Sequence, residues 1–148
     1  MKSIKNTGVM KINNILIDSD ILLDFFLQRE PFFDDSIKIL SLCEKRKANG
    51  FVTGLIISNT YYLLKKHFQH KMIVADFKKL LIFLDVLTTD KKTVLQAIDS
   101  EFVDFEDALQ NFSAESQGLI DSIITRNIKD YKKSNLSILT PEMFLNTL

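Results

Sequence analysis

The sequence predicts an α/β fold, with a central parallel sheet of about five short strands between two layers of helices. Short apolar runs that end abruptly in polar residues alternate with segments of helical periodicity, which is typical of parallel strands covered on both faces. The four glycines and two prolines make up only 6 of the 148 residues, so the loops should be short and the helices numerous. A chain of this length can bury a core without a disulfide or a metal ion.

In the first half of the chain, polar residues end the apolar runs and cap the helices. The first strand stops at Asp18. The second helix is expected to be capped by Asp34 or Asp35 and to end at Asn49-Gly50, in the order typical of a helix C-terminus. The predicted elements are a strand at 15–17, a helix at 21–27, this second helix, a strand at 51–53, and helices at 56–68 and 71–83.

The second half continues the alternation. Gly118 is expected to end the long helix, and Pro141 to open a terminal helix at its first position, where the missing N–H of proline removes no hydrogen bond. The other predicted elements are a strand at 85–88, helices at 91–99 and 104–117, and strands at 120–125 and 137–140. Residues 1–12 are polar with little periodicity, so we expect a flexible extension followed by one domain at 13–148.

Composition excludes several classes of protein. Lysine plus arginine equals aspartate plus glutamate at 19 each, so no overall field attracts nucleic acid or a membrane. The single cysteine, Cys43, excludes an internal disulfide and a cysteine-built zinc site. The longest apolar run, 80–84, is far shorter than the roughly 20 residues of a membrane helix. No secretory signal is visible at the N-terminus, and we expect a cytoplasmic protein.

Polar residues follow the predicted strands at the edge where ligands of open parallel sheets bind. They are Asp18 and Asp20 after the first strand, Asp104 and Asp107 at the start of the long helix, and Arg126, Asn127 and Asp130 after the fourth strand. Helix-dipole complementation explains Asp104 but explains Asp107 less well. Carboxylates gathered in a cleft repel one another, and Mg²⁺ or Mn²⁺ is the usual counter-charge for oxygen ligands. The alternative is that these acids are helix caps and solvated charges.

Two stretches of the chain resemble the PIN-domain ribonucleases, in particular their VapC-like toxins. The opening ILIDSDILLDFFLQREPF is similar to the family's first motif, D-T/S-N-hydrophobic-L-L-D followed by R-x-P-F. The closing half, with DFEDALQ and then a strand that ends in T-R-N before D-Y, is similar to the family's second half. The resemblance implies a three-layer α/β/α fold and Mg²⁺- or Mn²⁺-dependent hydrolysis of RNA. It also implies a small antitoxin protein as partner and a homodimer.

The resemblance assigns roles residue by residue. Asp18 and Asp107 match the first and third acids of the family, and Asn127 matches its fourth position. Asn59 stands at the second position, where the family usually has glutamate, and an amide brings no charge to a metal ion. The full expected set is Asp18, Asp107, Asn127 and Asn59 as catalytic residues, Asp104 as a further metal ligand, Asp20 and Asp130 as a second rank, and Arg126 and Lys129 as substrate-binding residues.

Two other functions remain open on the sequence. Asn59 is also compatible with a catalytically weakened PIN-like module that binds RNA or protein without cutting it. The spacing Asp18-x-Asp20 also resembles phosphatases of the haloacid dehalogenase type, although their later Gly-Asp-rich motif has no convincing match here.

The segment 65–71, KKHFQHK, is the most basic stretch of the chain. It lies at the C-terminus of a predicted helix, so its cations can complement the helix dipole. The alternative is a patch that contacts phosphates beside the cleft, together with Lys129, Lys132 and Lys133.

Overall fold

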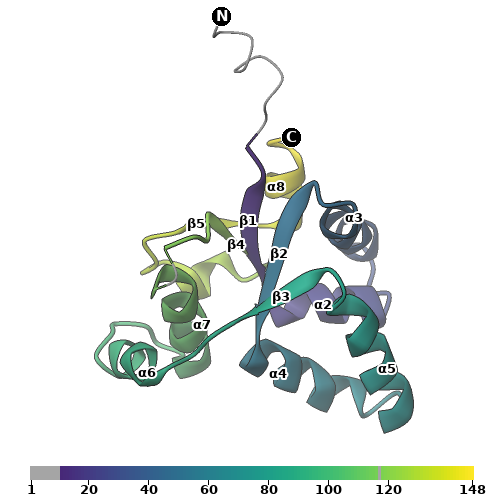
Figure 1. Ribbon diagram of the computed structural model, residues 1–148, viewed down its shortest axis with the longest axis horizontal. Helices are drawn as coiled ribbons and strands as arrows, with labels where there is room; N and C mark the ends of the chain where they lie inside the picture. Colours follow the sequence, from purple (N-terminus) through teal and green to yellow (C-terminus); the bar gives the residue numbers. More distant parts are fainter. Residues whose placement is uncertain (1–10, 117) are drawn as a thin grey trace, which may run out of the picture.

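The computed structural model describes residues 11–116 and 118–148, and it confirms the predicted fold (Figure 1). Five parallel strands form one sheet in the order β3-β2-β1-β4-β5. Helices α2, α3 and α5 lie on one side of the sheet, and α6 and α7 lie on the other (Figure 1). The elements are β1 (Asn13–Ile17), α2 (Ser19–Phe26), α3 (Phe33–Glu44), β2 (Ala48–Thr53), α4 (Gly54–Leu64), α5 (His70–Leu80), β3 (Leu84–Leu87), α6 (Lys91–Ile98), α7 (Phe105–Ser116), β4 (Ser122–Ile124), the 3₁₀ helix η1 (Ile128–Tyr131), β5 (Ser137–Leu139) and α8 (Pro141–Leu145).

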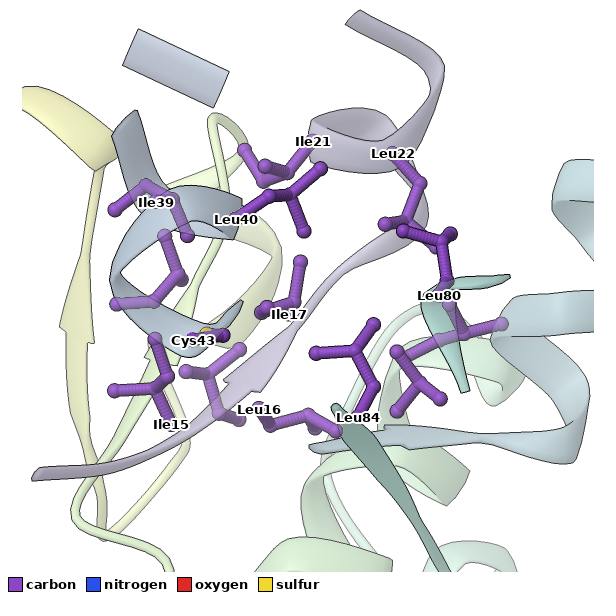
Figure 2. Packing of buried hydrophobic residues seen from close by; sticks show 14 of the residues in the cluster. Ile15, Leu16, Ile17, Ile21, Leu22, Ile39, Leu40, Cys43, Leu80 and Leu84 are labelled. Carbon is purple, nitrogen blue, oxygen red and sulfur yellow. The ribbon is translucent and has the colours of Figure 1, made fainter. Parts of the chain in front are cut away.

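The centre of the core is the layer between β1 and α3. Ile15, Leu16 and Ile17 of β1 are fully buried, as expected for a central strand that is covered on both faces. Figure 2 shows the side chains of Ile39, Leu40 and Cys43 from α3 gathered over this strand. Burial of each large aliphatic side chain contributes about 1.5–3 kcal/mol, so β1 is a firmly held platform for the residue that follows it.

The boundary between α3 and β2 differs from the prediction. The helix ends at Glu44, and Asn49-Gly50 lies inside β2 instead of ending the helix. Arg46, with φ 60°, takes the left-handed conformation at this helix end. Gly50 is needed for packing, because a Cβ atom there would lie 2.5 Å from Leu84 and 2.7 Å from Cys43. Gly50 therefore marks the close approach of α3, β2 and β3, and does not mark a turn.

Three further helix termini differ from the prediction. Neither Asp34 nor Asp35 caps α3; the helix begins at Phe33, and both acids lie in its first turn. Helix α4 begins at Gly54, capped by Thr53, whose Oγ1 accepts a hydrogen bond from the Ile56 N–H at 3.0 Å. It ends at Leu64, four residues before the predicted end.

At the N-terminus, residues 1–10 of the predicted extension lie outside the described residues. Lys11 forms an ion pair with Asp121 at 2.9 Å. Within 11–116 and 118–148, no helix has the length and apolar character needed to cross a bilayer.

Candidate active site

The site lies where the strand order of the sheet reverses. From β1 the chain continues to β2 on one side, whereas β4 lies on the other side and leads to β5. Ile17 and Ile124 are register partners at the ends of β1 and β4, so the next residues, Asp18 and Thr125, are neighbours. The Asp18 N–H donates to the Ile124 carbonyl at 3.0 Å. This crevice beyond the carboxyl ends of the strands is where open α/β sheets bind ligands.

Asp18 is held rigidly and is only 7% exposed. It caps α2, because its Oδ1 accepts a hydrogen bond from the Ser19 N–H at 2.8 Å. Its Oδ2 accepts hydrogen bonds from Thr125 Oγ1 at 3.0 Å and from the Tyr131 hydroxyl at 3.2 Å. Burial nevertheless raises the pKa of Asp18 above its usual value. The three donors fix the direction of the carboxylate without supplying a positive charge.

Asp20 lies in the first turn of α2 and faces the end of β4. Its Oδ2 accepts hydrogen bonds from the Arg126 backbone N–H at 2.9 Å and from the Asn127 side-chain amide at 3.4 Å. Its Oδ1 is buried and has no hydrogen-bond partner among the described residues. Burial, reinforced by the charge of Asp18, raises the pKa of Asp20 to about 7. A buried carboxylate oxygen without a hydrogen-bond donor is costly.

The start of α7 brings further carboxylates to the same site. Asp104 caps this helix, because its Oδ1 accepts a hydrogen bond from the Asp107 N–H at 3.0 Å. Burial and the negative charges of Asp104, Asp18 and Asp130 raise the pKa of Asp107 to about 7. The carboxylates of Asp18, Asp104 and Asp130, which come from three separate parts of the chain, thus lie within electrostatic reach of Asp107.

Arg126 is engaged with α2 and the loop that follows it. Its guanidinium pairs with both carboxylate oxygens of Asp24, at 2.7 and 3.0 Å, and Asp24 is only 1% exposed. The guanidinium carbon lies 3.8 Å from the centre of the Phe32 ring, in a cation–π contact. These contacts hold the chain at the position where the Arg126 N–H binds Asp20.

Three expected site residues have fewer contacts. Asn59 lies in the second turn of α4, which begins directly at the carboxyl end of β2; its side chain is partly buried and makes no hydrogen bond within the described ranges. Lys129 and Asp130 are exposed in η1. The structure therefore joins Asp18, Asp20 and Asn127 through one hydrogen-bonded group that includes Thr125, and neither Asn59 nor Lys129 forms a hydrogen bond to this group within the described residues.

The chemistry of this site fits a hard divalent cation. Every candidate ligand atom is an oxygen, which is the donor preferred by Mg²⁺ and Mn²⁺. The raised pKa values of Asp18, Asp20 and Asp107 show that negative charge is poorly compensated here. In the described part of the chain, no three carboxylate, histidine or thiol groups already form a metal cage. Asp18, Asp107 and the amide oxygen of Asn127 are the groups that would hold the ion, with the unpartnered oxygen of Asp20 beside them.

Sequence reasoning missed the residues that orient Asp18. Thr125 and Tyr131 are both buried, and each donates a hydrogen bond to this carboxylate. Both residues belong to the motif T-R-N followed by D-Y, in which Thr125 comes first and Tyr131 last. From the sequence, only the asparagine, arginine and aspartate of this motif are predicted to be site residues.

Comparisons with known proteins identify the family and support the fold. A model of the PIN domain matches residues 14–129. The fold is similar to a toxin-antitoxin complex from Klebsiella pneumoniae, with 20% identity and a TM-score of 0.65 over 86% of this chain and 97% of that one. VapBC2 from Rickettsia felis, bound to a promoter DNA fragment, has 12% identity and a TM-score of 0.64 over 86% and 98% of the two chains.

A further structural neighbour is VapC20 from Mycobacterium tuberculosis, a toxin that cleaves the sarcin-ricin loop, with 16% identity and a TM-score of 0.59 over 74% of this chain and 86% of that one. No curated protein sequence matches the chain. The likeness to these structures concerns the fold, and the domain model covers most of the sequence, including both strands that frame the site. The chain belongs to the PIN domain family.

Proposed function

We propose that this protein is a metal-dependent endoribonuclease that acts as the toxin of a toxin-antitoxin pair. The observation that carries the proposal is the buried Asp18 carboxylate at the reversal of the strand order, with Asp107 within electrostatic reach. Membership of the PIN domain family and the likeness to VapC-type toxin structures support it. With RNA as its substrate, the proposed activity belongs in the cytoplasm.

A divalent ion bound at this site would lower the pKa of a bound water and stabilise negative charge on a phosphoryl group. The residues of the chain provide the positioning. Thr125 and Tyr131 hold Asp18 in one orientation, and the backbone at Arg126 holds Asp20. Such fixed dipoles and ligands reduce the reorganisation required in the transition state. Lys129, which is exposed in η1, would contact the substrate backbone in this proposal.

The proposal is tested by cleavage of a structured RNA pool with Mg²⁺, Mn²⁺ or EDTA. The wild type is compared with the Asp18→Asn and Asp107→Asn variants. Each substitution should lower the cleavage rate by roughly a hundredfold or more, about 2.7 kcal/mol of transition-state stabilisation, while circular dichroism remains unchanged. The matched control is Asp85→Asn, which removes an exposed carboxylate from β3 at the far edge of the sheet.

Full activity in both site variants would show that the assignment is wrong. Asn59 is the observation that favours a second candidate, a PIN-like module that binds RNA or protein without cutting it. Absence of cleavage by folded wild-type protein with metal present would support that module. In that case Asn59→Glu should create metal-dependent cleavage if the missing charge is the cause.

An apolar groove supports the proposed antitoxin partner. It lies between α2, α3 and α5, has a volume of about 520 Å³, and is lined by the aromatic rings of Phe25, Phe26, Phe33 and Phe83. Such a groove suits the apolar face of an amphipathic helix. Because α2 also carries Asp18 at its N-cap, a partner bound there would lie one helix away from the catalytic carboxylate.

A homodimer is also part of the proposal. Light scattering of the purified chain measures its molar mass and so tests whether it is a dimer.

A further inference from the structure

The corner between α4 and α5 concentrates positive charge in a protein whose net charge is zero. We define this α4–α5 corner as residues 62–71, which include Lys65, Lys66 and Lys71. All three lysines are exposed, and none forms an ion pair within the described residues. The sequence contains no acid between Glu44 and Asp76. The corner is thus the opposite of the site, where carboxylates gather.

Only part of this charge is explained by the local helices. Lys65 and Lys66 follow the last residue of α4, where cations complement the helix dipole. Lys71 lies in the first turn of α5, where a cation is unfavourable. That turn contains no acid, and its N-cap residue, Gln69, makes no capping hydrogen bond. The charge of Lys71 therefore has no stabilising partner within its own helix.

Aromatic side chains lie among these lysines. Tyr62 is 66% exposed and Phe68 is 38% exposed. A hydrogen bond of 2.8 Å between the Tyr61 hydroxyl and His70 Nδ1 links α4 to α5 and fixes the relative position of the two helices at this corner. Exposed aromatic rings between lysines form the usual surface for single-stranded nucleic acid, in which bases stack on rings and phosphates meet cations. The Tyr62 ring is the best exposed platform of this corner.

The corner lies at the far end of a helix that begins near the site. Helix α4 begins directly after β2, at the same edge of the sheet as the site, and runs away from it to the corner (Figure 1). Its 11 residues span about 16 Å at 1.5 Å per residue. At 3.4 Å per nucleotide this corresponds to about five nucleotides, and fewer in a more extended strand.

We propose that the α4–α5 corner binds single-stranded RNA a few nucleotides away from the phosphate that is cleaved. The inference rests on the proposed ribonuclease function and adds the surface that attracts its substrate. The site itself is lined by carboxylates that repel RNA, so the lysines of the corner supply the attraction and Tyr62 stacks on an unpaired base. The alternative ligand of this surface is an acidic protein segment, and the test below distinguishes the two.

The test measures binding of a labelled single-stranded RNA to the full chain in EDTA by fluorescence anisotropy. The corner variant is Lys65→Gln/Lys66→Gln/Lys71→Gln. Its matched control is Lys38→Gln/Lys45→Gln/Lys47→Gln, which removes three exposed lysines in and after α3 and leaves the same net charge. The corner variant should raise the Kd roughly tenfold or more and lower the slope of log K against log salt by about 2. The control should stay within about twofold of the wild type.

Tyr62→Leu separates stacking from charge. It should raise the Kd for single-stranded RNA roughly tenfold without changing the salt slope, and leave binding of duplex RNA unchanged. Equal weakening by the corner and control triples would overturn the inference, because the attraction would then be non-specific. Unchanged RNA binding in the corner variant would also overturn it and would leave an acidic protein segment as the occupant.

Cleavage assays distinguish this inference from the proposed function. If the wild type cleaves RNA and the corner variant has the same KM on long substrates, the corner inference fails and the nuclease stands. If no RNA is cut but binding depends on the corner, the nuclease fails and the RNA-binding surface stands. If both hold, the effect of the corner variant on KM should disappear for substrates trimmed to fewer than about five nucleotides on either side of the cut.

Discussion

The apolar layer between β1 and α3 and the polar edge where β1 and β4 end are adjacent along one strand but opposite in energetics. In the layer, Ile15, Leu16 and Ile17 are fully buried against aliphatic side chains. At the edge, the next residue, Asp18, is nearly as buried but is a carboxylate surrounded by other acids. The apolar layer stabilises the fold, whereas burying the carboxylates at the polar edge lowers the stability of the protein. The buried side chains of β1 therefore supply the rigidity that holds the Asp18 carboxylate in place.

The largest expected effect is at the ion pair between Asp24 of α2 and Arg126, which follows β4 at the polar edge. Asp24→Asn should destabilise the protein by about 3 kcal/mol in urea unfolding, because it removes the carboxylate that pairs with both Arg126 and Arg29. It should also lower cleavage activity, since the backbone of Arg126 holds Asp20. The control is Glu101→Gln, at the exposed pair with Lys133, which should stay within experimental error. Equal stability of Asp24→Asn and wild type would contradict the structural role of this pair.

A smaller effect is expected in the apolar layer itself. Gly50→Ala should destabilise the protein by about 2 kcal/mol, because the new methyl group would overlap Leu84 and Cys43. The matched control is Gly54→Ala at the start of α4, where an added Cβ meets no atom within 4 Å. Chemical denaturation of both variants checks the difference. If the two glycine variants were equally stable, the three elements would not pack as closely as described.

The smallest expected effect is the dependence of the protein's stability on pH, which arises from the carboxyls at the polar edge. Asp20 and Asp107 have a pKa of about 7 in the folded protein, against about 3.8 when unfolded. Folding therefore favours the protonated acids, so metal-free stability should fall as pH rises from about 4 to about 7 and then level off. For Asp107 alone the loss is on the order of 1 kcal/mol, because solvent screens this half-buried carboxyl.

Thermal unfolding in EDTA at pH 5 and pH 8 measures this loss, and the difference between wild type and Asp107→Asn isolates it from other titrating groups. The variant should lose less stability over this range. Added Mg²⁺ or Mn²⁺ should reduce the loss in the wild type. A wild type whose stability rises between pH 5 and pH 8 relative to the variant would contradict the raised pKa values.

Local sequence patterns were sufficient for the order of the elements. The runs at 15–17 and 85–88 alternate with helical segments, and the structure has strands at both positions. The patterns were insufficient at Asn49-Gly50, which carries the residue types of a helix end but lies within β2. The reason is that the requirement for glycine at position 50 comes from α3 and β3, which approach it from elsewhere in the chain. A local signal cannot separate a turn from such a close approach.

The same division applies to the candidate site. Asp18, Asp107 and Asn127 were identified from the sequence, because strand ends and a family motif mark them, and their catalytic roles remain a proposal. The hydrogen bonds from Thr125 and Tyr131 to Asp18, and the pairing of Arg126 with Asp24, were decided only by the tertiary structure. These partners are more than 100 residues apart, and only the register of β1 beside β4 brings them together. The sequence by itself thus determined which chemical groups are available, and the tertiary structure decided which of them face one another, because burial and distance are set by packing.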